Sequence, residues 1–259
     1  MGRRAAIILC ISVATLVALG LVMLASTSAW VHGVDDDPYL LVKRQGAFAG
    51  VGMVMALLAG CLDYRILRKI WMPLLVVGCA LLALCYIPGV QVIVKGEARW
   101  IWAPVIGRFQ PSEVAKLLVI VALAAWFAQY RAEAKSLVKG FLMPGLVLGI
   151  PVALIFFEKD MGTAVALGGA GFLVMFAAGT RLSLLCLVTA VGIVGLYTAV
   201  ESDPYRRMKF EALLNLDDPD VQRKAGYQQY RSKLALASGG LLGAGLGNGA
   251  EKHGYLPEA

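Results

Sequence analysis

The chain alternates between long apolar runs and short polar stretches. A bilayer core of about 30 Å requires roughly 20 helical residues, and a backbone in lipid must satisfy its own hydrogen bonds. None of the apolar runs shows the alternation typical of a strand. The pattern therefore predicts an all-α fold, a polytopic membrane bundle in residues 1–200 with about seven transmembrane helices, at 5–30, 46–62, 70–87, 112–130, 141–157, 162–179 and 182–200.

Composition supports an integral membrane protein and excludes several other classes. Hydrophobic residues make up 59% of the chain and charged residues only 16%, unlike an ordinary soluble domain. The cysteines lie in or at the edges of apolar runs without the spacing of metal ligands, so we expect buried free thiols, with no disulfide framework and no zinc site. They are Cys10, Cys61, Cys79, Cys85 and Cys186.

Basic residues gather in alternate loops and so predict an orientation. The positive-inside rule places these loops in the cytoplasm, together with the N-terminus. The other loops also carry basic residues, so the orientation rests on an excess of basic residues in one set of loops and not on their absence from the other set. Residues 201–259 are then extracytoplasmic. The loops assigned to the cytoplasm contain Arg3, Arg4, Arg65, Arg68, Lys69, Arg131, Lys135, Lys139 and Arg181.

The net charge of +7 does not indicate a nucleic-acid partner, because the basic residues are spread over short loops. Anionic lipid is the simpler partner. The familiar catalytic templates are also missing from the sequence. It has two distant histidines, His32 and His253, and no Walker loop, GxSxG or HExxH motif.

Two polar constellations lie at the predicted ends of helices, where ionisable groups suggest function. Pro111 suits the first turn of a helix, and Glu113 then falls near its third position. Lys116 follows three residues later, so the two charges share a helix face and can form an ion pair. This pair is either structural or, beside Arg99, part of a cavity for an anionic lipid head group.

The second constellation is the charged triplet Glu158-Lys159-Asp160 between two apolar runs. Asp160 can cap the helix that begins near Gly162, or it can belong to a functional site. The glycine-rich segment 201–259 carries the remaining charges, and we expect a solvated loop with a short amphipathic element.

Seven motifs identify a family. GEARWI, FQPSEVAK, KDMGTA, DPYRR, GYQ..RS, SGG..G.GLGN...K and YLPEA occur in this order. The chain resembles the FtsW/RodA group, the SEDS proteins, over nearly its whole length. GLGN, Lys252 and YLPEA are more similar to FtsW, the septal division member, than to RodA.

The resemblance implies a peptidoglycan glycosyltransferase with about ten spans in the whole protein. Such an enzyme polymerises lipid II on the outer face of the bacterial cytoplasmic membrane, with a class B penicillin-binding protein transpeptidase and other divisome membrane proteins. A general base deprotonates the acceptor C4 hydroxyl, and cations stabilise the departing undecaprenyl pyrophosphate. No cofactor is assigned, and a divalent cation stays an open alternative. The candidate substrate-binding residues are Arg99, Glu113, Lys116, Asp160, Arg206, Arg207, Arg231, Ser232, Lys252 and Glu258.

The expected catalytic base lies outside the chain. In the family it is an aspartate in the continuation of YLPEA, usually His-Thr-Asp-Phe, which would follow Ala259. The chain resembles about the first two thirds of a SEDS protein, so we expect an inactive N-terminal fragment and a truncated loop at 201–259. A truncated gene product, a partial sequence and a cropped sequence are all compatible with this.

The sequence departs from the family pattern at two places. Glu158-Lys159 stands where Gln-Pro is common, and Arg231 stands where Gln is common. A planar guanidinium at position 231 could bind phosphate better than an amide. Two alternatives to the polymerase remain from the sequence: a lipid II flippase or transporter, and a non-catalytic division scaffold.

Overall fold

A computed structural model describes residues 2–28, 37, 39–94, 97–103, 107–240, 243–245 and 248–249. The chain divides into two compact units, which are described one at a time. One unit comprises residues 62–194, and the other comprises residues 1–61 and 195–259.

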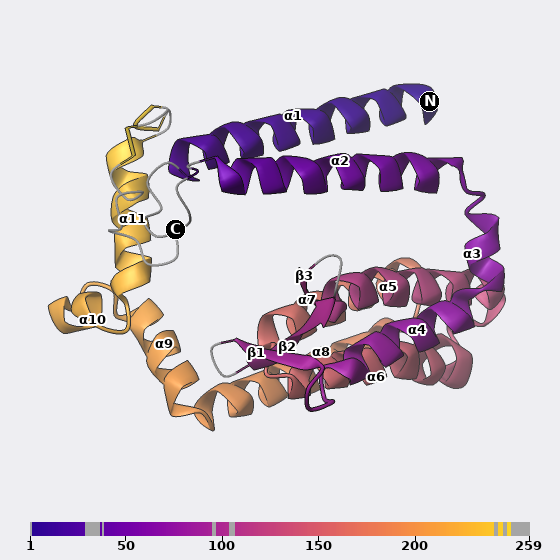
Figure 1. The fold of residues 1–259 in the computed structure, drawn as a ribbon. Helices are drawn as coiled ribbons and strands as arrows, with labels where there is room; N and C mark the ends of the chain where they lie inside the picture. Colours follow the sequence, from indigo (N-terminus) through magenta and orange to yellow (C-terminus); the bar gives the residue numbers. More distant parts are fainter. Residues whose placement is uncertain are drawn as a thin grey trace. The chain divides into compact units, whose positions relative to one another are not determined.

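The unit of residues 62–194 is a helix bundle with a small sheet at one end (Figure 1). Its helix α6 continues from a π-helical turn at Val138–Leu142, so that the two together form one apolar stretch. Helix α8 begins in this unit and extends into the other. The helices are α3 (Arg65–Lys69), α4 (Trp71–Leu84), α5 (Pro111–Gln129), α6 (Met143–Phe157), α7 (Met161–Ala177) and α8 (Leu182–Glu201).

Helix α5 is the centre of this bundle, because it packs against α4, α6 and α7. Ala115, Val119 and Ala122 of α5 are fully buried, and their spacing places them on one helix face. Between α6 and α7, the Leu148 side chain packs directly over Gly171. A Cβ atom there would lie 2.4 Å from the Leu148 side chain, so a larger residue would require repacking.

A three-stranded antiparallel sheet lies between α4 and α5 in the sequence. Its strands are β1 (Gln91–Val94), β2 (Glu97–Ala103) and β3 (Gly107–Phe109), in the order β1-β2-β3. Ile101 of the central strand faces Gln91 on one side and Phe109 on the other. The prediction from the apolar runs did not include this sheet, because its strands are only three to seven residues long and lie between two of those runs.

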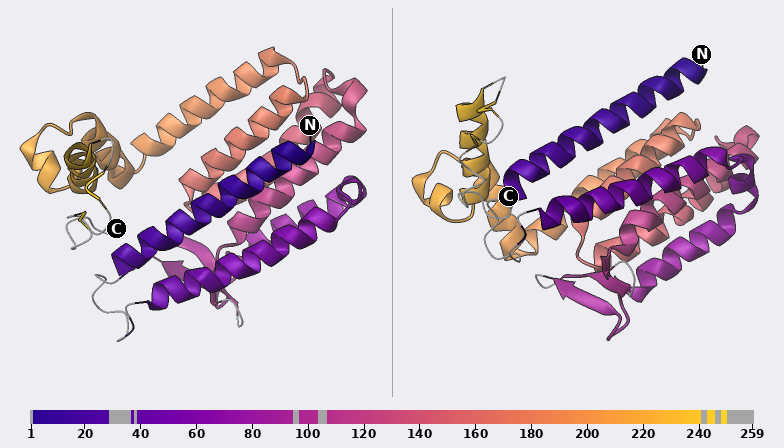
Figure 2. Two further views of the ribbon diagram at one scale, coloured as in Figure 1. Left: turned by 90° about the horizontal axis from the view of Figure 1, so that it is seen from above. Right: turned by 45° about the horizontal axis from the view of Figure 1, so that its top comes forward.

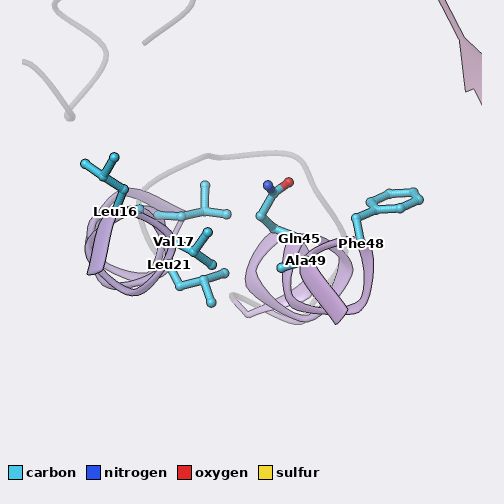
Figure 3. Close-up of a pocket in the computed structure, with 8 residues that line it drawn as sticks. Leu16, Val17, Leu21, Gln45, Phe48 and Ala49 are labelled. Carbon is cyan, nitrogen blue, oxygen red and sulfur yellow. The ribbon is translucent and has the colours of Figure 1, made fainter. Parts of the chain in front are cut away.

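In the other unit, helices α1 (Gly2–Ser28) and α2 (Leu40–Cys61) pack against each other. An apolar groove of about 610 Å³ runs between them, with Leu16, Val17 and Leu21 on one side and Gln45 and Phe48 on the other (Figure 3). Most of their apolar side chains are exposed. Such surfaces are costly in water and are suited to a lipid environment.

Between α8 and residue 240, the polar segment contains three further helices, α9 (Pro204–Leu214), α10 (Pro219–Arg223) and α11 (Tyr227–Gly239), seen in Figure 2 towards the C-terminal end of the chain. The Asp203 and Asp218 side chains cap α9 and α10, each directly before a proline in the first turn. The expectation of a loop with one short amphipathic element was therefore too simple for residues 204–239. The predicted boundary at residue 200 stays a prediction.

In the part of the chain that the structure describes, each of the seven apolar runs is largely helical, which confirms the predicted all-α membrane bundle. Five helices of this part are long and apolar enough to span a bilayer, whereas Trp71–Leu84 and Met161–Ala177 are shorter. The number of seven crossings stays a prediction. The thiols are free, but the expected burial is wrong for three of them, because Cys10, Cys61 and Cys186 lie exposed on helix surfaces while Cys85 is buried.

Candidate functional site

The site is built around Asp160, the residue that begins α7. Its Oδ1 accepts a hydrogen bond from the backbone N–H of Thr163 at 3.0 Å, and its Oδ2 accepts one from Thr163 Oγ1 at 2.9 Å. These bonds satisfy a free donor of the first helical turn and place a negative charge at the positive end of the helix dipole. The predicted capping role of Asp160 is confirmed.

Gln110 connects the start of α7 to the start of α5. It is the residue before Pro111, and its amide nitrogen lies 3.1 Å from Asp160 Oδ2 and 3.1 Å from Ser112 Oγ. Pro111 and Ser112 are fully buried, so this corner of the bundle is closely packed. A single side-chain amide thus fixes two helix N-termini next to each other.

Arg99 of β2 brings a positive charge to the same carboxylate. Its Nη1 lies 3.6 Å from Asp160 Oδ2, with the Arg99 side chain 32% exposed and the Asp160 side chain 7% exposed. The two constellations that are separate in the sequence therefore meet in the structure. The guanidinium is held by a buried anion but still reaches solvent, an arrangement that can recognise an anionic group.

Glu113 and Lys116 form the predicted ion pair on α5. The Glu113 Oε1 to Lys116 Nζ distance is 3.0 Å, and the side chains are 58% and 31% exposed. An exposed pair of this kind contributes about 0–1 kcal/mol to stability. The pair occupies the first turns of the helix whose start touches Asp160, and its role in binding substrate stays a prediction.

Glu158 is the buried acid of the site. It follows the last residue of α6 and is 4% exposed. Burial, and secondly the charge of Asp160, raises the pKa of Glu158 from 4.5 to about 7. Burial also raises the pKa of the Cys85 thiol to about 12, with Glu158 as a further cause. Cys85 therefore stays a neutral thiol at physiological pH.

The remaining candidates lie outside this cluster. Arg206 Nε is 3.2 Å from Asp203 Oδ2. Arg207 pairs with Glu211 at 2.8 Å and with Glu201 at 3.5 Å. Both arginines thus contact acids of their own segment, which would compete with a phosphate for them.

Two more candidates are on α11. Ser232 Oγ donates to the Gln228 carbonyl at 2.9 Å inside its own helix, and Arg231 precedes it. Lys252 and Glu258 lie outside the described residues. Across the ranges that the structure describes, no three His, Cys, Asp or Glu side chains gather closely enough to hold a metal ion. The divalent cation stays untested.

Sequence reasoning missed Gln110 as a partner of Asp160. A signal was present, since the residue before a proline that starts a helix is the N-cap, and N-cap side chains are often placed to bond across a helix start. The partner itself could not be read from the sequence, because it comes from another helix.

Comparison with known proteins agrees with this architecture. Residues 6–259 match the model of the cell cycle protein family that comprises FtsW, RodA and SpoVE. The chain is 35% identical over 255 residues to a probable peptidoglycan glycosyltransferase FtsW of Geobacter metallireducens, covering 98% of this chain and 67% of that protein. It is 34% identical to the stage V sporulation protein E of Bacillus subtilis, covering 94% and 66%.

Two solved structures show the same fold. A chain of a peptidoglycan synthase complex superposes with a TM-score of 0.63 at 28% identity, covering 88% of this chain and 65% of that one. The rod shape determining protein RodA of Thermus thermophilus gives 0.52 at 24% identity, covering 94% and 89%. The chain spans about two thirds of the length of its FtsW and SpoVE relatives. With its apolar helices, its motif order and these matches, the chain belongs to the FtsW/RodA/SpoVE family of multi-pass SEDS membrane proteins.

Proposed function

We propose that this protein is a peptidoglycan glycosyltransferase that polymerises lipid II into glycan strands for septal cell-wall synthesis. The observation that carries the proposal is the cluster in which Arg99, Gln110 and Asp160 meet at the helix starts of α5 and α7, in a chain that matches FtsW relatives along 98% of its length. A partly exposed guanidinium beside two helix N-termini suits an anionic pyrophosphate.

The layout of the bundle supports an outer-face location for this cluster. Within residues 62–194, the sheet and the starts of α5 and α7 are at one end of the helices, and the basic segments around Arg65, Arg131 and Arg181 are at the other. The positive-inside rule assigns the basic end to the cytoplasm. The cluster then faces the compartment in which a lipid-linked disaccharide is polymerised.

The proposed reaction needs a general base for the acceptor hydroxyl and cations for the leaving group. A general base removes the proton of the acceptor hydroxyl as it attacks the anomeric carbon of the donor sugar, and the pyrophosphate leaves with the lipid. Arg99 and Lys116 stabilise the negative charge that develops on this leaving group. No residue of the described part is assigned the role of the base.

A class B penicillin-binding protein transpeptidase is the proposed partner, together with other membrane proteins of the division machinery. The similarity to a chain of a solved peptidoglycan synthase complex supports this partner. Lipid II is the proposed substrate because the FtsW relatives are named as peptidoglycan glycosyltransferases.

A polymerisation assay tests the function. Because the chain spans 67% of the Geobacter metallireducens relative, we would compare the 259-residue chain with a chimera that carries the final third of that relative. With fluorescent lipid II and a transpeptidase partner in detergent, the chimera should make glycan strands and the chain alone should not. Movement of lipid II across vesicle membranes without any polymer would instead identify a flippase.

Glu113→Ala and Lys116→Ala in the chimera test the binding role of the ion pair. Each should lower polymerisation at least tenfold, equivalent to about 1.4 kcal/mol of transition-state stabilisation, while the exposed pair itself stabilises the fold by no more than about 1 kcal/mol. Glu133→Ala is the matched control, because Glu133 pairs with Lys139 at 2.8 Å at the far end of α5. Unchanged polymerisation in both test variants would show that Glu113 and Lys116 have only a structural role.

A further inference from the structure

Glu158 is a buried carboxyl group that the proposed chemistry does not use. Both of its oxygens are buried, and neither has a hydrogen bond of regular geometry among the described residues. The Cys85 thiol is a weak donor that lowers the pKa of Glu158, but burial, which raises it, is the larger cause. The next residue, Lys159, has a left-handed backbone with φ of +68°, and this turn leads directly into the cap residue Asp160. The turn therefore holds Glu158 inside the bundle while Asp160 contacts Arg99.

The surroundings of Glu158 offer little stabilisation to a negative charge. Cys85 is 1% exposed and Tyr86 donates its hydroxyl proton to the Leu154 carbonyl, so the two groups from the end of α4 present a neutral thiol and a phenol that is already bonded. Both groups are close enough to couple electrostatically to Glu158.

The charged groups nearby are already engaged. Asp160 carries a negative charge of its own, accepts hydrogen bonds from Thr163 and Gln110, and forms an ion pair with Arg99. Helix α5, which packs against α6, brings Glu113 and Lys116, which pair with each other. Lys159 is exposed. A second carboxylate beside Asp160 is therefore disfavoured by desolvation and by repulsion.

We propose that Glu158 is a positioning residue whose ionisation controls the charge of the Arg99–Asp160 cluster and so the affinity of the cluster for a pyrophosphate-bearing lipid. When Glu158 is neutral, the contact between Arg99 and Asp160 joins one positive and one negative charge. When Glu158 is ionised, the cluster gains one negative charge, which weakens the attraction of an anionic ligand. The ligand part of this inference rests on the proposed function.

The burial of Glu158 determines how the stability of the folded chain changes with pH. The pKa of Glu158 is raised to about 7 in the folded chain, so the folded state holds this proton more tightly than the unfolded state. Stability from this group is present below about pH 4.5, the ordinary value, and is lost as the pH rises toward 7. Ligand affinity should fall over the upper part of the same range, near the folded-state pKa.

Unfolding of the 259-residue chain tests the ionisation without any assumption about activity. Between pH 4.5 and 8, the folded-to-unfolded ratio of the wild type should fall by about 150-fold relative to Glu158→Gln. Glu133→Gln is the control, because Glu133 is an exposed glutamate in an ion pair and should leave the wild-type slope unchanged. Parallel curves for the wild type and Glu158→Gln would overturn the proposal.

A second measurement applies if Glu158→Gln does not fold. The carboxyl stretch of protonated Glu158 in the wild-type infrared difference spectrum should disappear with a midpoint near pH 7. If every protonated carboxyl band of the folded chain is gone at pH 5.5, Glu158 is not the acid proposed here.

Binding of undecaprenyl pyrophosphate to the same chain then tests the ligand. From pH 6 to pH 8, its Kd should rise by at least threefold more in the wild type than in Glu158→Gln, in which any change reports the titration of the ligand's own phosphate. An equal rise in both proteins would overturn control by Glu158. If neither protein binds at any pH, the proposed function fails, and the unfolding curves still decide whether Glu158 titrates near pH 7.

Discussion

Replacement of Asp160 separates the capping role of this residue from the role of its charge. Asn is as good an N-cap as Asp, so Asp160→Asn keeps the bond to the Thr163 backbone and loses the charge. Asp160→Ala loses both. The two variants therefore divide the interactions of one side chain into a local part and a tertiary part.

The contacts of Asp160 in the structure determine how much stability each variant should lose. Loss of the cap costs about 1 kcal/mol, and loss of the bonds from Gln110 and from the Thr163 hydroxyl costs about 1 kcal/mol each. The ion pair adds no more than about 1 kcal/mol, since Arg99 is about a third exposed and lies 3.6 Å away. We expect a cost of about 3 kcal/mol for Asp160→Ala and of about 1–2 kcal/mol for Asp160→Asn.

The assay is unfolding of the detergent-purified chain by SDS, followed by circular dichroism. A double-mutant cycle between Asp160→Asn and Arg99→Gln should give a coupling energy of about 0.5–1 kcal/mol. Equal costs for the Asn and Ala variants would refute the capping argument. A cost below about 0.5 kcal/mol for Asp160→Ala would show that the whole cluster contributes little to stability.

Two further predictions use the same unfolding assay. Gly171→Leu should destabilise the chain by about 1–3 kcal/mol through overlap with Leu148, and Leu148→Ala should relieve part of this cost; Gly168→Ala, where space is open, is the control and should be neutral or stabilising. Lys159→Gly should stabilise the chain by about 0.5–1 kcal/mol, because its φ of +68° suits glycine. A loss of stability in Lys159→Gly would mean that the lysine side chain has a contact that outweighs the backbone strain.

Features that depend on neighbours in the sequence were predicted correctly. The helical runs follow from hydrophobicity and length, and the cap by Asp160 and the Glu113–Lys116 pair follow from the spacing of residues within one turn. Asp160 and Thr163 are three residues apart, as are Glu113 and Lys116, so the geometry of one helical turn is enough to bring each pair together.

The three-stranded sheet could not be predicted from the local sequence. Strands β1 to β3 are only three to seven residues long, which is too short for a clear alternation of apolar and polar positions. Pairing between the strands satisfies their backbone groups and places Arg99 of β2 next to α7. The local pattern of residues does not predict which strands pair.

The sequence by itself determined the class of the protein, its apolar helices and the local charge pairs at their ends. Only the tertiary structure decided that Arg99, Gln110 and Asp160 meet and that Glu158 is enclosed beside Cys85. The physical reason is that membrane helices are apolar on nearly every side, so hydrophobicity selects the segments but not the faces that pack. Close fits such as Gly171 against Leu148 select those faces, and they exist only after the helices have assembled.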